Sequence, residues 1–226
     1  MTAHLVENSC FSCTLNGNLP GIEDTFELHI TVDQTVNLEA FKWFCYTAGI
    51  KALVIDLGVG VAMQPMTCSR VAGSFAQATL GAAKLRTALE AAGFTVTRVK
   101  LEAAPWNTGV PTTDEQAKRS PSGNYFEHHT KLKLEKNANL KLLEQLCTSN
   151  QAHVSRNAFK SFTDGSSERL ITQRHYGLGF SSASSRFTAF LEVLKSYGFE
   201  VQKTVSEYCV FDSNLELDAT WVAIAS

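Results

Sequence analysis

Residues 25–32 read Thr-Phe-Glu-Leu-His-Ile-Thr-Val, in which apolar and polar side chains alternate strictly. Successive side chains of a β-strand point to opposite faces, so this alternation predicts a strand with one buried face. The opposite face of that strand then carries Glu27, His29 and Thr31. An acid, an imidazole and a hydroxyl on one side of one strand make this stretch the first place to look for chemistry.

The same stretch returns later in the chain, followed by the same sequence features. The spacing between matched residues grows slowly along the chain, as small loop insertions would make it. Three matched pairs show the repeat: Phe26–His29 with Phe126–His129, Asn37-Leu38 with Asn139-Leu140, and Gly93-Phe94 with Gly198-Phe199. An internal repeat constrains the architecture more than any single element does.

Each copy contains strand and helix patterns in the order β-α-β-β-α-β. In the first copy the predicted elements are strand 25–32, helix 38–48, strands 51–57 and 64–71, helix 75–92 and strand 94–101. In the second they are strand 125–134, helix 139–149, strands 152–158 and 168–175, helix 182–197 and strand 199–206. With right-handed crossovers, this order gives the ferredoxin-like sandwich, an antiparallel sheet with two helices on one face. The sequence therefore predicts an α+β fold of two tandem ferredoxin-like repeats related by a pseudo-twofold, with the first strand of each between the third and fourth.

The repeats divide the chain into four segments. Residues 1–23 form an N-terminal extension, and residues 24–106 are the first repeat. Residues 107–123 are polar and rich in turn formers, which is typical of a connector. Residues 124–226 are the second repeat, whose tail from Leu215 to Ile224 alternates like one more strand.

Composition excludes several classes of partner. The chain has 226 residues and a net charge of −2, so no broad basic field favours nucleic acid. It has no apolar run long enough to span a membrane, and no secretory signal at its start. Four of the six cysteines lie in apolar periodic segments, which favours a reduced, cytoplasmic protein. We expect a monomer or a homodimer. The pair Cys10 and Cys13 has metal-ligand spacing but no second pair to complete a site, so we expect neither a metal nor a cofactor.

The strongest candidates for a site are polar residues at matched positions. His29 is matched by His129, and the neighbouring third strands carry Arg70 and Arg174. Arginine binds phosphate or carboxylate through two hydrogen bonds, and histidine exchanges a proton near neutral pH. Lys131, on the same face as His129, adds a cation. We therefore expect a small anionic ligand in a cleft between the repeats that is lined by histidine and arginine.

The ends of the fourth strands offer further ligand-binding candidates. Glu102 is followed by Trp106 and Asn107, and Glu207 occupies the equivalent place in the second copy. A carboxylate, a ring and an amide together can line a pocket. Residues 177–185 also lead into a helix N-terminus, whose free N–H groups favour an anion.

An alternative interpretation is purely structural. The matched histidines would then lie between two packed sheets, hydrogen-bonded to Glu27 or Glu127, and the arginines would pair with Glu102 and Glu207. In that case no cleft would lie beside them.

The stretch Leu28-His29-Ile30-Thr31-Val32 also resembles the apolar-His-apolar-Thr-apolar motif of the 2H phosphoesterase superfamily. That resemblance implies a metal-independent phosphodiesterase, in which His29 and His129 exchange protons and Thr31 holds the phosphate oxygens. A second literal His-x-Thr string is His128–Thr130. The repeat aligns His29 with His129, so alternation predicts that His128 and Thr130 face the helices instead.

Overall fold

The computed structural model describes residues 21–57, 63–157 and 165–218. Within these ranges the chain forms two consecutive βαββαβ units, as the repeat predicts. Cys10 and Cys13 lie outside the described residues. No helix in the described part of the chain is both long and apolar enough to cross a membrane.

The first repeat contains four strands and two helices. Their bounds are β1 Glu23–Val32, α1 Leu38–Thr47, β2 Lys51–Asp56, β3 Met63–Ser74, α2 Phe75–Ala91 and β4 Val96–Ala103. The second repeat contains β5 Tyr125–Leu134, α4 Leu140–Ser149, β6 Ala152–Asn157, β7 Ser167–Tyr176, α5 Phe180–Ser196 and β8 Glu200–Asp212. The strand β8 differs most from expectation, because it continues six residues beyond its predicted end at residue 206, to Asp212.

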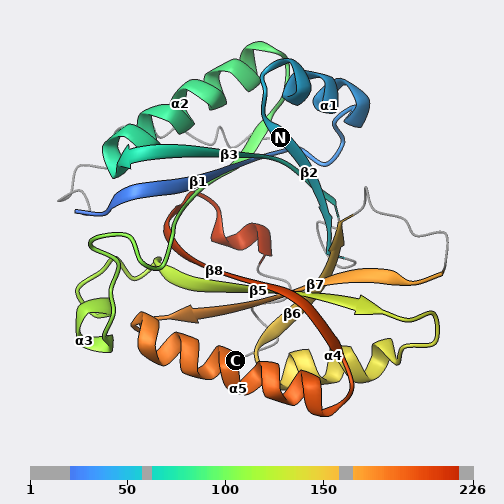
Figure 1. Ribbon diagram of the computed structural model, residues 1–226. Coiled ribbons are helices and arrows are strands. Elements are labelled where there is room, and N and C mark those ends of the chain that lie inside the picture. The colour runs from blue at the N-terminus through green and yellow to red at the C-terminus, as the bar shows by residue number, and fades with distance from the viewer. Residues whose placement is uncertain (1–20, 58–62, 158–164, 219–226) are drawn as a thin grey trace, which may run out of the picture.

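Eight antiparallel strands close into one barrel, in the order β1-β3-β2-β6-β7-β5-β8-β4. Inside each repeat the first strand lies between the third and fourth, as predicted. The repeats join at two seams, where Ile55 of β2 faces Asn157 of β6 and Leu101 of β4 faces Phe211 of β8. The helices α1 and α2 cover one side of the barrel and α4 and α5 the opposite side (Figure 1). The sheet face that a single repeat would leave bare therefore becomes the barrel interior.

The helix-facing side of each sheet holds a hydrophobic core. In the first repeat, Phe26, Leu28 and Ile30 of β1 are fully buried under α1 and α2. Full burial of one such side chain contributes roughly 1.5–3 kcal/mol. An asparagine caps the first helix of each repeat, since the side chains of Asn37 and Asn139 accept hydrogen bonds from free N–H groups of α1 and α4.

The second repeat has polar groups where the first has apolar ones. His128 and Thr130 stand at the positions of Leu28 and Ile30, and both are fully buried toward the helices. The His128 ring stacks on Phe187 of α5, with 4.4 Å between centroids, and its Nδ1 contacts Ser206 Oγ at 2.7 Å. Burial lowers the pKa of His128 to about 3, so the ring is neutral in the folded protein.

The connector is ordered against the start of α5. It contains the short helix α3 (Asp114–Ala117), and the Asp114 carboxylate accepts hydrogen bonds from Gly179 N at 2.8 Å and from Ser182 Oγ at 3.1 Å. Gly179 is required there because a Cβ would lie 2.3 Å from the Thr113 carbonyl carbon. The anion expected at this helix N-terminus is therefore the chain's own carboxylate.

The tail departs from its predicted strand. Leu215–Asp218 forms a 3-10 helix, η1, and residues 219–226 lie outside the described part of the chain. Figure 1 shows η1 in the space between the two sheets, within the barrel. Alternation failed here because η1 inserts one polar residue, Asp218, among the charged groups of the interior, where it is almost fully buried.

Candidate functional site

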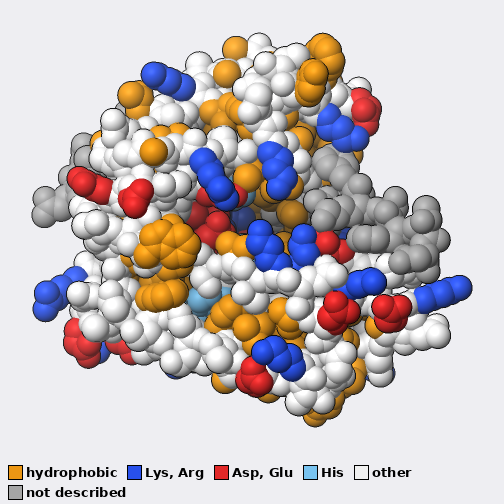
Figure 2. Space-filling model, viewed as in Figure 1, with side chains coloured by type: hydrophobic (Ala, Val, Ile, Leu, Met, Phe, Trp, Pro, Cys, Tyr) orange, Lys and Arg blue, Asp and Glu red, His pale blue; other side chains and the backbone are white. Residues whose placement is uncertain are grey.

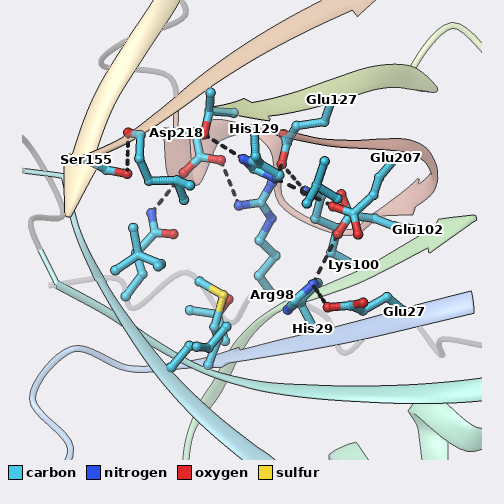
Figure 3. A pocket seen from close by; sticks show the side chains of 18 of the residues that line it. Glu27, His29, Arg98, Lys100, Glu102, Glu127, His129, Ser155, Glu207 and Asp218 are labelled. Atoms are coloured by element: carbon cyan, nitrogen blue, oxygen red, sulfur yellow. Dashed lines mark hydrogen bonds and ion pairs between the residues drawn. The ribbon is translucent and has the colours of Figure 1, made fainter. Parts of the chain in front are cut away.

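Closure of the barrel brings the matched polar residues of both repeats into one interior. Strand alternation points Glu27 and His29 of β1 inward, together with Glu102 of β4. The equivalent inward residues of the second repeat are Glu127, His129 and Glu207. Figure 3 shows both sets projecting toward the same space. Each repeat thus contributes one matched histidine with two glutamates, and the second repeat adds His153 of β6.

His29 is held on both sides of its ring. Its Nδ1 lies 3.2 Å from the backbone oxygen of Thr67, and its Nε2 lies 3.2 Å from Glu102 Oε2 and 3.6 Å from Glu27 Oε1. Burial alone would lower the pKa of His29, but the hydrogen bond and charge of Glu102 raise it above its ordinary value. The protonated ring is therefore favoured.

His129 has a closely similar arrangement. Its Nδ1 lies 3.0 Å from Thr172 Oγ1, and its Nε2 lies 3.1 Å from Glu127 Oε1 and 3.6 Å from Glu207 Oε2. The structural alternative is right that both histidines are satisfied by glutamates of their own repeat. It is wrong about the arginines, because Arg70 and Arg174 pair with Glu27 and Glu127 instead of Glu102 and Glu207.

Lys100 of β4 links the two repeats. Its ammonium group lies 2.6 Å from a carboxylate oxygen of Glu102 and 2.6 Å from one of Glu127. Burial would raise the pKa of Glu102, yet the Lys100 charge holds it at about 2. Burial also opposes the ionisation of Glu127, and Arg174 with Lys100 keeps its pKa well below the ordinary value. Both carboxylates are therefore charged at neutral pH.

Asp218 closes the far side of this charged network. Its carboxylate accepts hydrogen bonds from Arg98 at 2.7 Å, from Arg174 at 2.7 Å and from Gln64 at 2.9 Å. Burial raises the pKa of Asp218, but the two guanidinium groups lower it to about 2. Arg98 also binds Asp212, at the end of β8. The 3-10 helix η1 is therefore tied to both repeats through one aspartate.

Glu207 is the exception among the interior carboxyl groups. Burial, followed by the negative charge of Glu102, raises the pKa of Glu207 to about 8. Its ion-pair partner among the described residues is the His129 ring, whose Nε2 lies 3.6 Å away. The equivalent residues Glu102 and Glu207 thus differ in protonation at neutral pH, because Lys100 neutralises only the first.

A cavity of about 320 Å³ opens beside these groups. Its polar wall contains the histidines, glutamates and arginines of the interior, with Thr31 among them. Its apolar wall consists of Leu53, Ile55, Leu57, Met66, Leu170 and Val205. Figure 2 shows the opening as a hollow with acidic groups inside and Lys and Arg side chains around it. Two of the lining lysines, Lys51 and Lys203, form no ion pair within the described residues.

Most of the predicted site residues line this cavity. They are His29, His129, Thr31, Arg70, Arg174, Glu102 and Glu207. Two others do not. Lys131 pairs with Glu168 at 3.3 Å and does not line the cavity. The buried Asn107 donates to the backbone oxygen of Thr25 at 2.8 Å, and Trp106 is exposed, so neither side chain lines this cavity.

Sequence reasoning missed several residues of the interior. Lys100 and Arg98 stand at alternate positions with Glu102 on β4, and the period of two alone would have placed them on the same face. Nothing in the sequence signals that Asp218 joins them, since it reaches the barrel through an irregular turn. Lys203 stands at the position of Arg98, and Lys51 at that of His153. They were missed because neither pair repeats the same residue type.

The two His-x-Thr strings do not share the cavity. His29 and Thr31 line it, whereas His128 and Thr130 are buried on the helix side of β5, as alternation predicts. The residue that matches Thr31 in the second repeat is Lys131. The arrangement implied by the 2H phosphoesterase resemblance, with a His-x-Thr string of each repeat facing the cavity, is therefore incomplete.

Comparison with known proteins gives no family. No family model matches the chain, and no curated protein matches it. Among solved structures, a putative glycine cleavage system transcriptional repressor is 8% identical, with 83% of this chain and 97% of that chain covered and a TM-score of 0.29. The small subunit of acetolactate synthase from Thermotoga maritima is 11% identical, with 83% and 95% covered and a TM-score of 0.29. A mutant chlorite dismutase from Candidatus Nitrospira defluvii is 11% identical, with 90% and 96% covered and a TM-score of 0.28. Likenesses this low carry no argument about function.

Proposed function

We propose that this chain binds a small organic anion inside its barrel. The observation that carries the proposal is the cavity of about 320 Å³, in which a cationic rim adjoins an apolar wall. A volume of this size suits a small molecule. The sequence led us to expect such an anion between the repeats, and the barrel interior is the space that both repeats line.

The balance of charge favours an anion over a cation as the main occupant. Lys100, Arg98 and Arg174 are each bonded to interior carboxylates, and Arg70 is bonded to Glu27. Lys51 and Lys203 line the same cavity without a carboxylate partner among the described residues. A ligand carboxylate or phosphate would supply the missing partner for these two ammonium groups.

The apolar wall favours an organic anion over an inorganic one. Six apolar side chains face the cavity opposite the charged groups. They come from β2, β3, β7 and β8 and from Leu57, which directly follows β2. Inorganic phosphate would leave that surface in contact with water. A ligand with an apolar body would bury it, which contributes about 25 cal/mol for each Å² removed from water.

Hydrolysis of a phosphodiester is the weaker candidate. Both histidines lie in the cavity, but the Nε2 atom of each is already close to glutamate oxygens. A metal-independent phosphodiesterase needs one histidine to accept a proton while the other donates one. Activity on a cyclic phosphodiester that disappears in both His29→Ala and His129→Ala would favour the enzyme instead.

The binding proposal is tested by calorimetry in the presence of a chelator. The panel pairs inorganic phosphate and acetate with phenyl phosphate and benzoate, so that each organic anion has an inorganic or smaller match. We expect the aromatic member of each pair to bind more tightly, because only it can cover the apolar wall. In the double variant Lys51→Ala/Lys203→Ala, affinity should fall by about tenfold or more, which corresponds to roughly 1.4 kcal/mol.

A matched control removes two lysines from the outer surface. Lys42 of α1 and Lys195 of α5 each pair with a glutamate three residues earlier and lie far from the interior. The variant Lys42→Ala/Lys195→Ala has the same net charge as the cavity variant and should bind like the wild type. Equal losses in both variants, or no binding by any member of the panel, would contradict the proposal.

A further inference from the structure

We infer that Glu27, His29 and Cys68 form a binding site for one divalent transition-metal ion of the zinc class. Their potential ligand atoms all lie within 4.8 Å of one another. His29 of β1 stands directly opposite Cys68 of β3 in the strand register. This site goes beyond the proposed anion binding, which requires no metal.

The orientation of His29 suits a metal ligand. Its Nδ1 contacts the backbone oxygen of Thr67, which is the usual way in which a metal-binding imidazole is fixed. This contact leaves Nε2 as the ligand atom. Nε2 lies 3.6 Å from Glu27 Oε1 and 3.2 Å from Glu102 Oε2, so the ion would replace the hydrogen bond to Glu102. The ring is therefore held in place before any ion arrives.

Glu27 and Cys68 supply the other two ligand atoms of the inferred site, Oε1 and Sγ, which lie on the side of His29. The Cys68 thiol donates to Glu27 Oε1 at 2.9 Å, while Arg70 binds the other oxygen, Oε2, at 3.1 Å. The guanidinium thus orients the carboxylate without blocking the oxygen on the metal side. Coordination would replace the thiol proton of Cys68 and the Nε2 proton of the imidazolium, and both protons pass to solvent.

The ligand atoms determine the kind of ion. Sulfur, nitrogen and a single carboxylate oxygen suit Zn²⁺ or Co²⁺ far better than Mg²⁺ or Ca²⁺, which prefer oxygen alone. Around a tetrahedral ion these atoms lie about 3.3–3.5 Å apart, given Zn–ligand bonds of about 2.0–2.3 Å. The two separations from Glu27 Oε1, 2.9 Å to Cys68 Sγ and 3.6 Å to His29 Nε2, differ from these values by less than about 0.7 Å. The fourth position would face the cavity.

The second repeat lacks an equivalent site. Thr172 replaces the cysteine opposite His129, and a hydroxyl is a much poorer ligand than a thiolate. Glu127 is bound by both Arg174 and Lys100, so neither of its oxygens is open to a cation. One ion per chain is the expected stoichiometry.

The test is a Co²⁺ titration of the full chain followed by visible absorption. Cys10 and Cys13 are replaced by serine in every sample, because a Cys-x-x-Cys pair can bind cobalt by itself. We expect one equivalent of Co²⁺ to produce a thiolate-to-metal charge-transfer band and the strong d–d bands of a tetrahedral ion. The buffer contains no organic anion or phosphate, so this result is independent of anion binding.

Matched variants identify the ligands. Cys68→Ser should abolish the charge-transfer band and weaken Zn²⁺ binding at least tenfold in calorimetry. Glu27→Gln keeps the side-chain shape and should weaken Zn²⁺ binding while retaining the band. Cys45→Ser removes a thiol buried beneath α1 and should leave both signals unchanged. Circular dichroism on each variant separates loss of a ligand from loss of folding.

Two outcomes would overturn the inference. One is the absence of a thiolate band in the protein that retains Cys68. The other is a band that survives in folded Cys68→Ser. Either result leaves the anion proposal intact, because that proposal is tested with a chelator present.

Discussion

The two repeats place the same cross-strand pair in opposite environments. Glu27 faces Arg70 between β1 and β3, and Glu127 faces Arg174 between β5 and β7. In the first pair the side chains are 19% and 75% exposed, whereas in the second they are 3% and 6% exposed. The two repeats share the residues of the pair and their strand register, but not their burial. Burial determines how much each ion pair affects the free energy of unfolding.

The cause of this difference lies outside the pair itself. Asp218 of η1 and Lys100 of β4 both contact the second pair, and nothing equivalent covers Arg70 within the described residues. A buried ion pair needs further hydrogen bonds to offset desolvation, and the second pair has them. The first repeat is left open, which is why the inferred metal site lies there.

The largest expected effect breaks the buried pair. Arg174→Ala leaves Glu127 and Asp218 with less positive charge in the interior, and loss of one partner of a buried ion pair typically costs about 3–5 kcal/mol. We expect a loss of unfolding free energy in that range, measured by urea denaturation at pH 7. The equivalent variant Arg70→Ala is the control, and its loss should lie below about 1 kcal/mol because the pair is exposed. Similar losses in both variants would mean that burial does not distinguish the repeats.

A second contrast between the repeats lies on the helix side of the sheets. Burial lowers the pKa of His128 to about 3 and that of His175 to about 4. Below the ordinary histidine pKa the unfolded chain takes up protons that the folded chain does not. The free energy of unfolding therefore decreases as the pH is lowered from about 6.5 to about 4. From pH 8 to pH 5 each histidine should contribute a loss of about 2 kcal/mol.

His128→Leu gives the second repeat the residue found at the matching position of the first, Leu28. The acid-dependent loss of unfolding free energy between pH 8 and pH 5 should then shrink by about 2 kcal/mol. The contributions of His175 and of His153, whose pKa burial also lowers, remain. Urea denaturation at pH 8, 6 and 5 measures the slope. An unchanged slope in His128→Leu would show that the ring is already protonated in the folded protein.

The smallest effect concerns a feature that the repeats share. Asn37→Ala and Asn139→Ala each remove a helix cap, which typically costs about 1 kcal/mol. Because both caps lie at exposed helix ends, the two losses should agree within a few tenths of a kcal/mol. Thermal denaturation of the two single variants and of the double variant measures this, and additive losses are expected. If Asn139→Ala lost several times more unfolding free energy than Asn37→Ala, the energetic difference between the repeats would include their helices.

Much of the fold and part of the site follow from periodicity. The alternation of residues 25–32 and 125–134 predicts which side chains face the helices, and it correctly separates His129 from His128. The same alternation could have predicted that Lys100 and Arg98 share the inner face of β4 with Glu102. The prediction that Lys131 and Asn107 line the site was wrong. The local sequence pattern indicates which face of a strand a side chain occupies, but not how far the cavity extends along that strand.

The sequence by itself determined the repeat, the strand order within each repeat and the polar face of each first strand, because these depend on local periodicity and short connections. Closure of the barrel was decided only by the tertiary structure, since the β2–β6 and β4–β8 seams depend on how two sheets meet. The same closure brings Glu102 and Glu127 to one lysine, inserts Asp218 and buries only one of two identical ion pairs. Long-range burial sets the charge of these groups, and no local pattern encodes it.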